Sequence, residues 1–257
     1  MSAPRGPRVL VTRPAAQAAV WVDRLRATGI DAEALPLIGI VPVADRHGLA
    51  AEWAGLAARR LVVFVSSNAV IHFFAARPSD LAWPAGVVAA APGPGTAEAL
   101  CDAGVPDAAI VAPASDAPQL DSESLWDRLQ GRDWRGTSAL IVSGDGGRDW
   151  LAERLQQAGA TVDSLPAYRR QAPAFAGDSA LRLTQAIADA AVVWLFSSAE
   201  AIANLERAAG AGRFARSRAV ATHPRIAERA RAAGFGRVIE AGPRFDAVVA
   251  CIQSIGP

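Results

Sequence analysis

The sequence repeats itself at a spacing of about 130 residues, and no other feature constrains the fold as strongly. Four pairs of residues keep this spacing: Gly29 and Gly159, Gly104 and Gly234, Pro36 and Pro166, and Leu25 and Leu155. The segment FVSSNAV, at Phe64–Val70, also resembles LFSSAEAI at Leu195–Ile202. Solenoid repeats have periods of about 20–50 residues, so a repeat of this length indicates two similar domains.

Short apolar runs alternate with stretches of helical periodicity along both halves. The candidate strands are Arg8–Thr12, Leu61–Ser66, Gly86–Ala90, Ala139–Ser143, Ala191–Ser197, Arg218–Thr222 and Arg237–Glu240. Most are continuously apolar, which is typical of strands buried on both faces of a parallel sheet. Between them, Ala18–Thr28 and Asp149–Ala158 carry apolar residues at helical spacing. We therefore expect two doubly wound α/β lobes, with a ligand site in their cleft at the carboxyl ends of the strands.

The charge balance and the cysteine content exclude several classes of protein. The 257 residues carry a formal net charge of +1, too small to indicate a nucleic-acid or membrane-surface partner. All 26 residues of the Lys+Arg total are arginine, so no lysine is available to form a Schiff base. Every fixed cation is a guanidinium, which can bind a carboxylate through two parallel hydrogen bonds. Cys101 and Cys251 form no CxxC motif, and no apolar run is long enough for a signal peptide or membrane span. We expect a cytoplasmic protein.

No common motif for nucleotide, metal or hydrolase chemistry occurs in the sequence. It lacks GxGxxG after a strand, GxxxxGK[ST], HExxH and GxSxG. His47, His72 and His223 are scattered without the spacing of metal ligands, so we expect surface or half-buried histidines and no metal site.

Several candidate strands end in small hydroxyl residues and lead directly into a helix. These turns are Ser66–Asn68, Pro92–Thr96, Ser122–Ser124, Ser197–Ala199 and Thr222–Arg225, with the glycine-rich Ser143–Arg148 as a variant. Helix N-termini present free N–H groups and the positive end of the helix dipole, so such turns bind carboxylates or phosphates. For any single turn, ordinary N-capping is the preferred interpretation. Six such turns in two related lobes favour a polyanionic ligand.

Tyr168 is the single tyrosine of the chain and is followed by Arg169 and Arg170. A phenol beside two guanidinium groups is a candidate proton donor to a leaving hydroxyl group. An ordinary strand tyrosine is the alternative interpretation.

The segments resemble, in order, those of the uroporphyrinogen-III synthase family. The resemblance is carried by VLVTRP, LRATGIDAEALPLIGI, FVSSNAV, PGPGTAEALCDAGV, SESLWDRL, ALIVSGDGGRDWLAERLQQAGATVDSLPAYRR and LFSSAEAIANL, over nearly the whole chain. Ser66 and Ser197 stand where the family often has threonine, so the hydroxyl group is kept. The resemblance implies two similar flavodoxin-like lobes of doubly wound parallel sheet, joined by a two-stranded β linker. One lobe would comprise residues 1–35 and 172–257 and the other residues 41–168, with linkers at about 36–40 and 168–173.

The family resemblance also implies a reaction. The substrate is hydroxymethylbilane, a linear tetrapyrrole and octa-carboxylate of haem biosynthesis. A hydro-lyase of this kind removes the terminal hydroxyl group and closes the ring with inversion of the last pyrrole, without a metal or cofactor. Tyr168 matches the tyrosine that assists departure of hydroxide. The expected substrate-binding residues are Arg13, Ser66, Ser67, Asn68, Gly93, Thr96, Ser122, Ser124, Arg148, Ser197, Ser198, Ala199, Thr222 and Arg225. We expect a monomer without nucleic-acid or membrane partners.

Two other classes of protein remain as alternatives. A non-catalytic ligand-binding or sensor protein would share the two-lobed fold, but Tyr168 and the two Ser-Ser turns favour an enzyme. A sugar-nucleotide transferase also has two α/β lobes, but would carry an acidic metal-binding pair or a diphosphate loop. The sequence contains neither.

Overall fold

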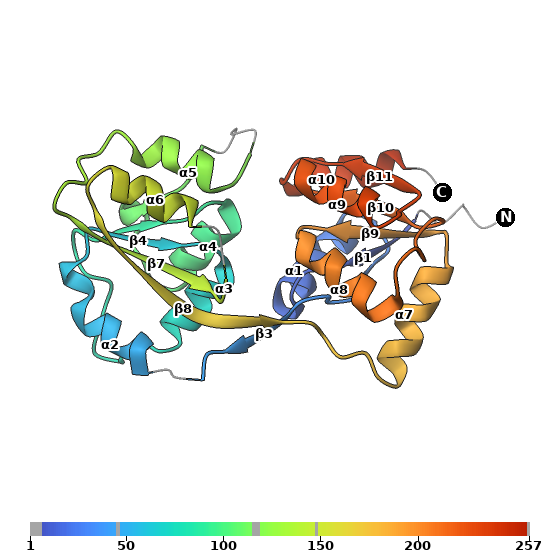
Figure 1. Cartoon of the computed structure of the whole chain (residues 1–257), viewed down its shortest axis with the longest axis horizontal. Coiled ribbons are helices and arrows are strands. Elements are labelled where there is room, and N and C mark those ends of the chain that lie inside the picture. Colours follow the sequence, from blue (N-terminus) through green and yellow to red (C-terminus); the bar gives the residue numbers. More distant parts are fainter. Residues whose placement is uncertain (1–6, 45–46, 115–118, 147–148, 256–257) are drawn as a thin grey trace. The chain divides into compact units, whose positions relative to one another are not determined.

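The computed structural model describes residues 7–44, 47–114, 119–146 and 149–255. The chain divides into two compact units (Figure 1). Unit 1 contains the residues up to Gly39 and those from Gln171 onward, and unit 2 contains Ile40–Arg170. The chain therefore leaves unit 1 once and returns to it once. The sequence predicts these connections at about 36–40 and 168–173.

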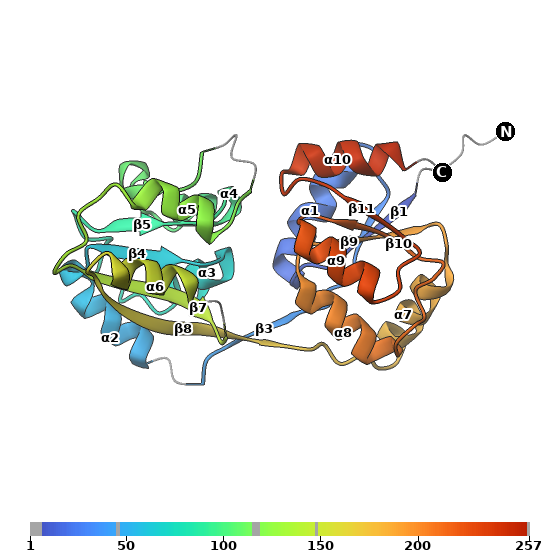
Figure 2. The same ribbon diagram turned by 45° about the horizontal axis from the view of Figure 1, so that its top comes forward.

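Unit 1 is built on a parallel sheet of five strands in the order β11-β10-β9-β1-β2. The strands are β1 (Arg8–Val11), β2 (Ala32–Ala34), β9 (Val192–Phe196), β10 (Arg218–Ala221) and β11 (Arg237–Glu240). The helices are α1 (Ala15–Ala27), α7 (Asp178–Ala188), α8 (Ala199–Ala209), α9 (Pro224–Ala232) and α10 (Phe245–Ser254). On one face, Val193 and Leu195 share a core with side chains of α1 and α10. Helices α8 and α9 lie on the other face (Figure 2), so the sheet is doubly wound.

Unit 2 has a sheet of six strands in the order β3-β8-β7-β4-β5-β6. The strands are β3 (Gly39–Pro42), β4 (Leu61–Phe64), β5 (Val88–Ala90), β6 (Ile110–Val111), β7 (Ser138–Gly144) and β8 (Thr161–Gln171). The helices are α2 (His47–Gly55), α3 (Ser67–Phe74), α4 (Pro94–Asp102), α5 (Ser122–Leu129) and α6 (Trp150–Gln157), with short 3-10 turns at Leu56–Ala58 and Asp107–Ala109. Alternate residues of β4 belong to the two cores on opposite faces of the sheet. Val62 and Phe64 pack with α2, α3 and α4, whereas Leu61 and Val63 pack with α5 and α6. This alternation explains why the run is continuously apolar.

The two sheets are permuted copies of each other. Strands β1 and β7 begin 130 positions apart, and so do helices α4 and α9. Across the sheets, β2-β1-β9-β10-β11 of unit 1 corresponds to β8-β7-β4-β5-β6 of unit 2. In chain order the strands of unit 1 lie 2-1-3-4-5, which is the flavodoxin-like arrangement. The predicted duplication and the predicted class of two doubly wound α/β lobes are confirmed.

The two segments that connect the units run beside each other. Strand β8 has 11 residues, whereas its counterpart β2 has 3, and the additional length reaches Gln171. Strand β3 is the outermost strand of the sheet and lies next to β8. A Cβ atom on Gly39 would lie 2.9 Å from Cγ of Gln171, so the two segments approach closely at this point.

Candidate functional site

Each sheet brings its hydroxyl-rich turns to one edge, the one at which the carboxyl ends of its parallel strands lie. In a parallel sheet every strand ends at the same edge, and the next helix begins there with its N-terminus. The helix starts of unit 2 that lie at this edge contain Ser66, Ser67, Asn68, Gly93, Thr96, Ser122 and Ser124. The turns and helix starts at the corresponding edge of unit 1 contain Arg13, Ser197, Ser198, Ala199, Thr222 and Arg225. Arg148, also expected in the site, lies outside the described residues.

Ser66 caps helix α3 and contacts Tyr168. Its backbone is extended, and its Oγ accepts a hydrogen bond from the backbone N–H of Ala69 at 3.2 Å. The same Oγ lies 3.0 Å from Oη of Tyr168, in a hydrogen bond that either hydroxyl group can donate. The fold therefore joins two residues that the sequence separates by 102 positions.

Tyr168 is held on three sides. It pairs with Gly144 after an irregularity in the register of β7 and β8, and only 4% of its surface is exposed. A Cβ atom on Gly144 would lie 2.8 Å from Cε2 and Cζ of the Tyr168 ring, so only glycine fits beneath it. The ring of His72 stacks against the phenol with centroids 5.7 Å apart. Both neighbours were absent from the predicted site, and their contact with Tyr168 arises only through the pairing of β8.

The arginines that follow Tyr168 point to other partners. The Arg170 guanidinium donates to the carbonyl oxygen of Gly146 at 2.8 Å, and its backbone N–H donates to the carboxylate of Asp145. These bonds connect Asp145 and Gly146, which directly follow β7, to β8. Arg169 is exposed.

Helix α4 begins without a capping side chain. Gly93 is its N-cap residue, Pro94 follows, and its first turn contains no acidic residue. Thr96 lies in this turn and is buried. The positive end of the helix dipole is therefore uncompensated by any acidic side chain of that turn, which favours an anion there.

In unit 1 the side chains that cap α8 and α9 differ from each other. Ser198 caps α8, and its Oγ accepts from the backbone N–H of Glu200 at 3.2 Å. His223 caps α9, and its Nδ1 accepts from the backbone N–H of Arg225 at 3.1 Å. Thr222 is buried next to this cap rather than acting as the cap. His223 has no role in the site predicted from the sequence, although the residue before Pro224 occupies the usual position of an N-cap.

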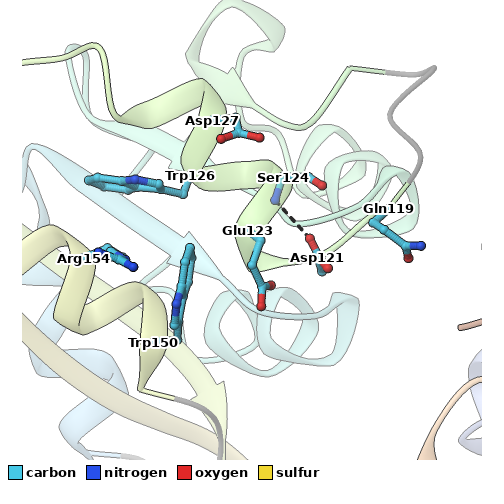
Figure 3. A pocket seen from close by; sticks show the side chains of 8 residues that line it. All are labelled: Gln119, Asp121, Glu123, Ser124, Trp126, Asp127, Trp150 and Arg154. Atoms are coloured by element: carbon cyan, nitrogen blue, oxygen red, sulfur yellow. Dashed lines mark hydrogen bonds between the residues drawn. The ribbon is translucent and has the colours of Figure 1, made fainter. Parts of the chain in front are cut away.

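The start of α5 differs in charge from the other turns. The Asp121 carboxylate accepts a hydrogen bond at 3.0 Å from the backbone N–H of Ser124, so the chain supplies its own anion (Figure 3). A pocket of about 350 Å³ adjoins this turn. Its lining residues are Gln119, Asp121, Glu123, Ser124, Trp126, Asp127, Trp150 and Arg154. The pocket holds three carboxylates and one guanidinium, so a further carboxylate is disfavoured here. Among the predicted turns, the one with Ser122 and Ser124 therefore has the least electrostatic support for binding a substrate carboxylate.

Arg13 follows β1 and directly precedes Pro14, the N-cap residue of α1. Its guanidinium carbon lies 4.2 Å from the centroid of the Trp21 ring. Burial lowers the pKa of Arg13 to about 10. Trp21, over whose ring the guanidinium lies, was absent from the predicted site.

Metal clusters and membrane-spanning helices are both missing from the described residues. No group of three or more His, Cys, Asp or Glu side chains there could hold a metal ion. No helix in the same part of the chain is long and apolar enough to cross a membrane.

These features define a two-unit, flavodoxin-like α/β protein with helix starts and hydroxyl-rich turns along the edge of each sheet. A family model described as uroporphyrinogen-III synthase HemD matches residues 19–250. The chain therefore belongs to the uroporphyrinogen-III synthase family, as the resemblance predicted. It is 34% identical over 173 residues to the uroporphyrinogen-III synthase of Salmonella typhimurium, which covers 66% of this chain and 67% of that protein.

Solved structures agree with this assignment at the level of the fold. A mutant uroporphyrinogen III synthase from Thermus thermophilus aligns with a TM-score of 0.58 and 20% identity, over 97% of each chain. The uroporphyrinogen-III synthetase of Helicobacter pylori aligns with a TM-score of 0.59 and 12% identity, over 97% of this chain and 99% of that one.

Proposed function

We propose that this chain is an active uroporphyrinogen-III synthase, which closes hydroxymethylbilane to uroporphyrinogen III with inversion of the last ring and loss of water. The observation that carries the proposal is the contact between Tyr168 and Ser66, in a chain that belongs to this family. It joins the expected proton donor to one of the expected carboxylate-binding turns.

Tyr168 would act as the general acid in the first step. The bond between the terminal carbon and its hydroxyl oxygen breaks, and the phenol proton goes to the departing oxygen, which leaves as water. The Ser66 hydroxyl lies 3.0 Å away. When Ser66 donates to the phenol oxygen, the proton of Tyr168 is available to the substrate.

The helix starts would hold the substrate in the geometry that inverts the last ring. The proposed carboxylate sites are the first turns of α3 and α4 in unit 2 and of α1, α8 and α9 in unit 1. Their backbone N–H groups and dipoles suit the acetate and propionate side chains of the substrate. Holding a flexible chain in one reactive conformation is the main catalytic task here.

We further propose that the enzyme is a lyase that works in the cytoplasm as a monomer, without a metal or organic cofactor. Cys101 and Cys251 are free thiols, which fits a reducing compartment.

The test is to incubate the protein with freshly prepared hydroxymethylbilane, with no added metal or cofactor, and to separate the uroporphyrin isomers after oxidation. The proposal expects the type III isomer. Formation of the type I isomer alone, at the rate without protein, would overturn it.

A further inference from the structure

Arg13 lies at the point in unit 1 where ligands of this fold class bind. Strand β1 lies between β2 and β9. The connection that follows β1 leads toward β2, whereas the one that follows β9 leads toward β10, in the opposite direction. Ligands of open α/β sheets bind outside the carboxyl ends of the strands at such a switch point. Arg13 comes two positions after the last residue of β1.

The Nε atom of Arg13 is buried, and no acidic side chain of the described residues pairs with the guanidinium. The residue as a whole keeps part of its surface exposed, but its Nε atom is inaccessible and has no hydrogen-bond partner. No carboxylate within the described ranges pairs with it, and desolvation is the one cause of its lowered pKa. A buried cation left in this way is unfavourable unless something else neutralises it.

Arg59 provides the contrast within the same chain. Its guanidinium bridges Glu52 and Asp163, with 2.9 Å between its Nη2 and Oε2 of Glu52, and these contacts raise its pKa. The charge of Arg59 is therefore balanced by two carboxylates of the chain itself. No acidic side chain of the described residues makes such a pair with Arg13.

The surroundings of Arg13 fix it in place and suit an anion. The guanidinium lies over Trp21, whose ring meets Phe245 edge to face with centroids 5.3 Å apart. Phe245 is the first residue of α10, so the stack joins the start of α10 to α1. Helix α1 begins beside Arg13 without a capping side chain and without an acidic residue in its first turn.

We infer that Arg13 is the residue of unit 1 that anchors one carboxylate of the substrate, and that Trp21 holds its guanidinium in position. The fork of N–H donors pairs with both oxygens of an acetate or propionate side chain. The inference rests on the proposed function, because it takes the tetrapyrrole as the ligand.

The test compares Arg13→Met with Arg24→Met, using uroporphyrinogen III as the ligand. Arg24 is a matched control because it lies on α1 and stacks on Phe245, 4.0 Å from the ring centroid, but is exposed. We expect Arg13→Met to weaken binding about tenfold to hundredfold and to raise KM more than it lowers kcat. Arg24→Met should bind like the wild type. The midpoint of thermal unfolding of free Arg13→Met should equal or exceed that of the wild type.

The inference would be overturned if Arg13→Met bound uroporphyrinogen III as tightly as the wild type. It would also be overturned if Arg13→Met had a lower unfolding midpoint and both variants lost the same amount of affinity. An activity assay on the wild type tests the proposed function separately, because the role of Arg13 is tested by binding. A wild type that binds uroporphyrinogen III through Arg13 without forming it would sink the proposed activity and keep the anchor. A wild type that does not bind it would overturn both.

Discussion

Oη of Tyr168 lies 3.0 Å from Oγ of Ser66, the residue that caps helix α3. The contact places the phenol of one strand at the positive end of a helix that follows another strand. A negative charge that develops on an oxygen near this position meets both a proton donor and the helix dipole.

Replacing Tyr168 with phenylalanine should lower kcat by about tenfold to hundredfold, because the proposed proton transfer from the phenol takes place in the transition state. The product should remain the type III isomer, since geometry sets the ring inversion. Ser66→Ala should give a smaller loss, and the double variant should resemble Tyr168→Phe, because both changes remove one interaction. Steady-state kinetics with separation of the isomers checks this, and a Tyr168→Phe variant with wild-type kcat would return Tyr168 to a structural role.

Gly144→Ala should displace the phenol without removing it. The added Cβ atom would lie 2.8 Å from two atoms of the Tyr168 ring, so the ring or the strand must move. We expect a loss of activity close to that of Tyr168→Phe. Gly48→Ala is the control, because its Cβ atom would meet nothing within 4 Å. Equal activity of both variants would show that the position of the phenol is unimportant.

Ser198 tests whether the backbone of the α8 turn binds the substrate. Ser198→Ala removes a side-chain cap and should cost about 1 kcal/mol of stability with a modest rise in KM. Ser198→Pro conflicts with the extended φ of −154° at this position and should raise KM much further. The measurement is KM in proteins shown to be folded by circular dichroism. Indistinguishable KM values for the two variants would argue against backbone binding at this turn.

The lowered pKa of Arg13 predicts how stability changes with pH. Below pH 10 Arg13 is charged in both the folded and the unfolded protein, so the whole cost of burying the charge is present. As pH rises through about 10, the folded form releases its proton while the unfolded form, whose pKa is higher, keeps it, and folding becomes less costly. The stability advantage of Arg13→Met over the wild type should therefore shrink by about 1 kcal/mol between about pH 9.5 and pH 11. Urea unfolding at matched pH checks this, and an advantage that does not change with pH contradicts it.

The repeat and the buried apolar runs were sufficient to predict the class of fold. All seven candidate strands exist, because each is rich in apolar residues, and the strand ends are off by at most one or two residues. Strands β2 and β6 were missed, since three and two residues are too few to show a pattern. Of strand β8 only the end from about Tyr168 was predicted, as part of the linker; its earlier residues were missed, because most residues of the strand are polar or exposed.

Much less of the site could be predicted. Hydroxyl residues before helices were visible in the sequence, but N-capping and ligand binding require the same residues. The acidic pocket beside α5 and the stacking of Arg13 on Trp21 depend on which helices pack together. No local spacing encodes the pairing of β8, and only this pairing brings Tyr168, Gly144 and Ser66 together.

The return of the chain to unit 1 has a consequence for synthesis on the ribosome. Leu10 of β1 pairs with Trp194, and the Thr12 hydroxyl donates to the carbonyl oxygen of Leu195. At about 5–20 residues per second, β1 therefore waits roughly 10–40 s for β9 to be made. Unit 2 lies wholly within that interval and is one uninterrupted stretch of chain. During that interval β1 has only one of its two neighbours, β2, and the backbone N–H and C=O groups on the edge that β9 will cover stay unpaired by the sheet.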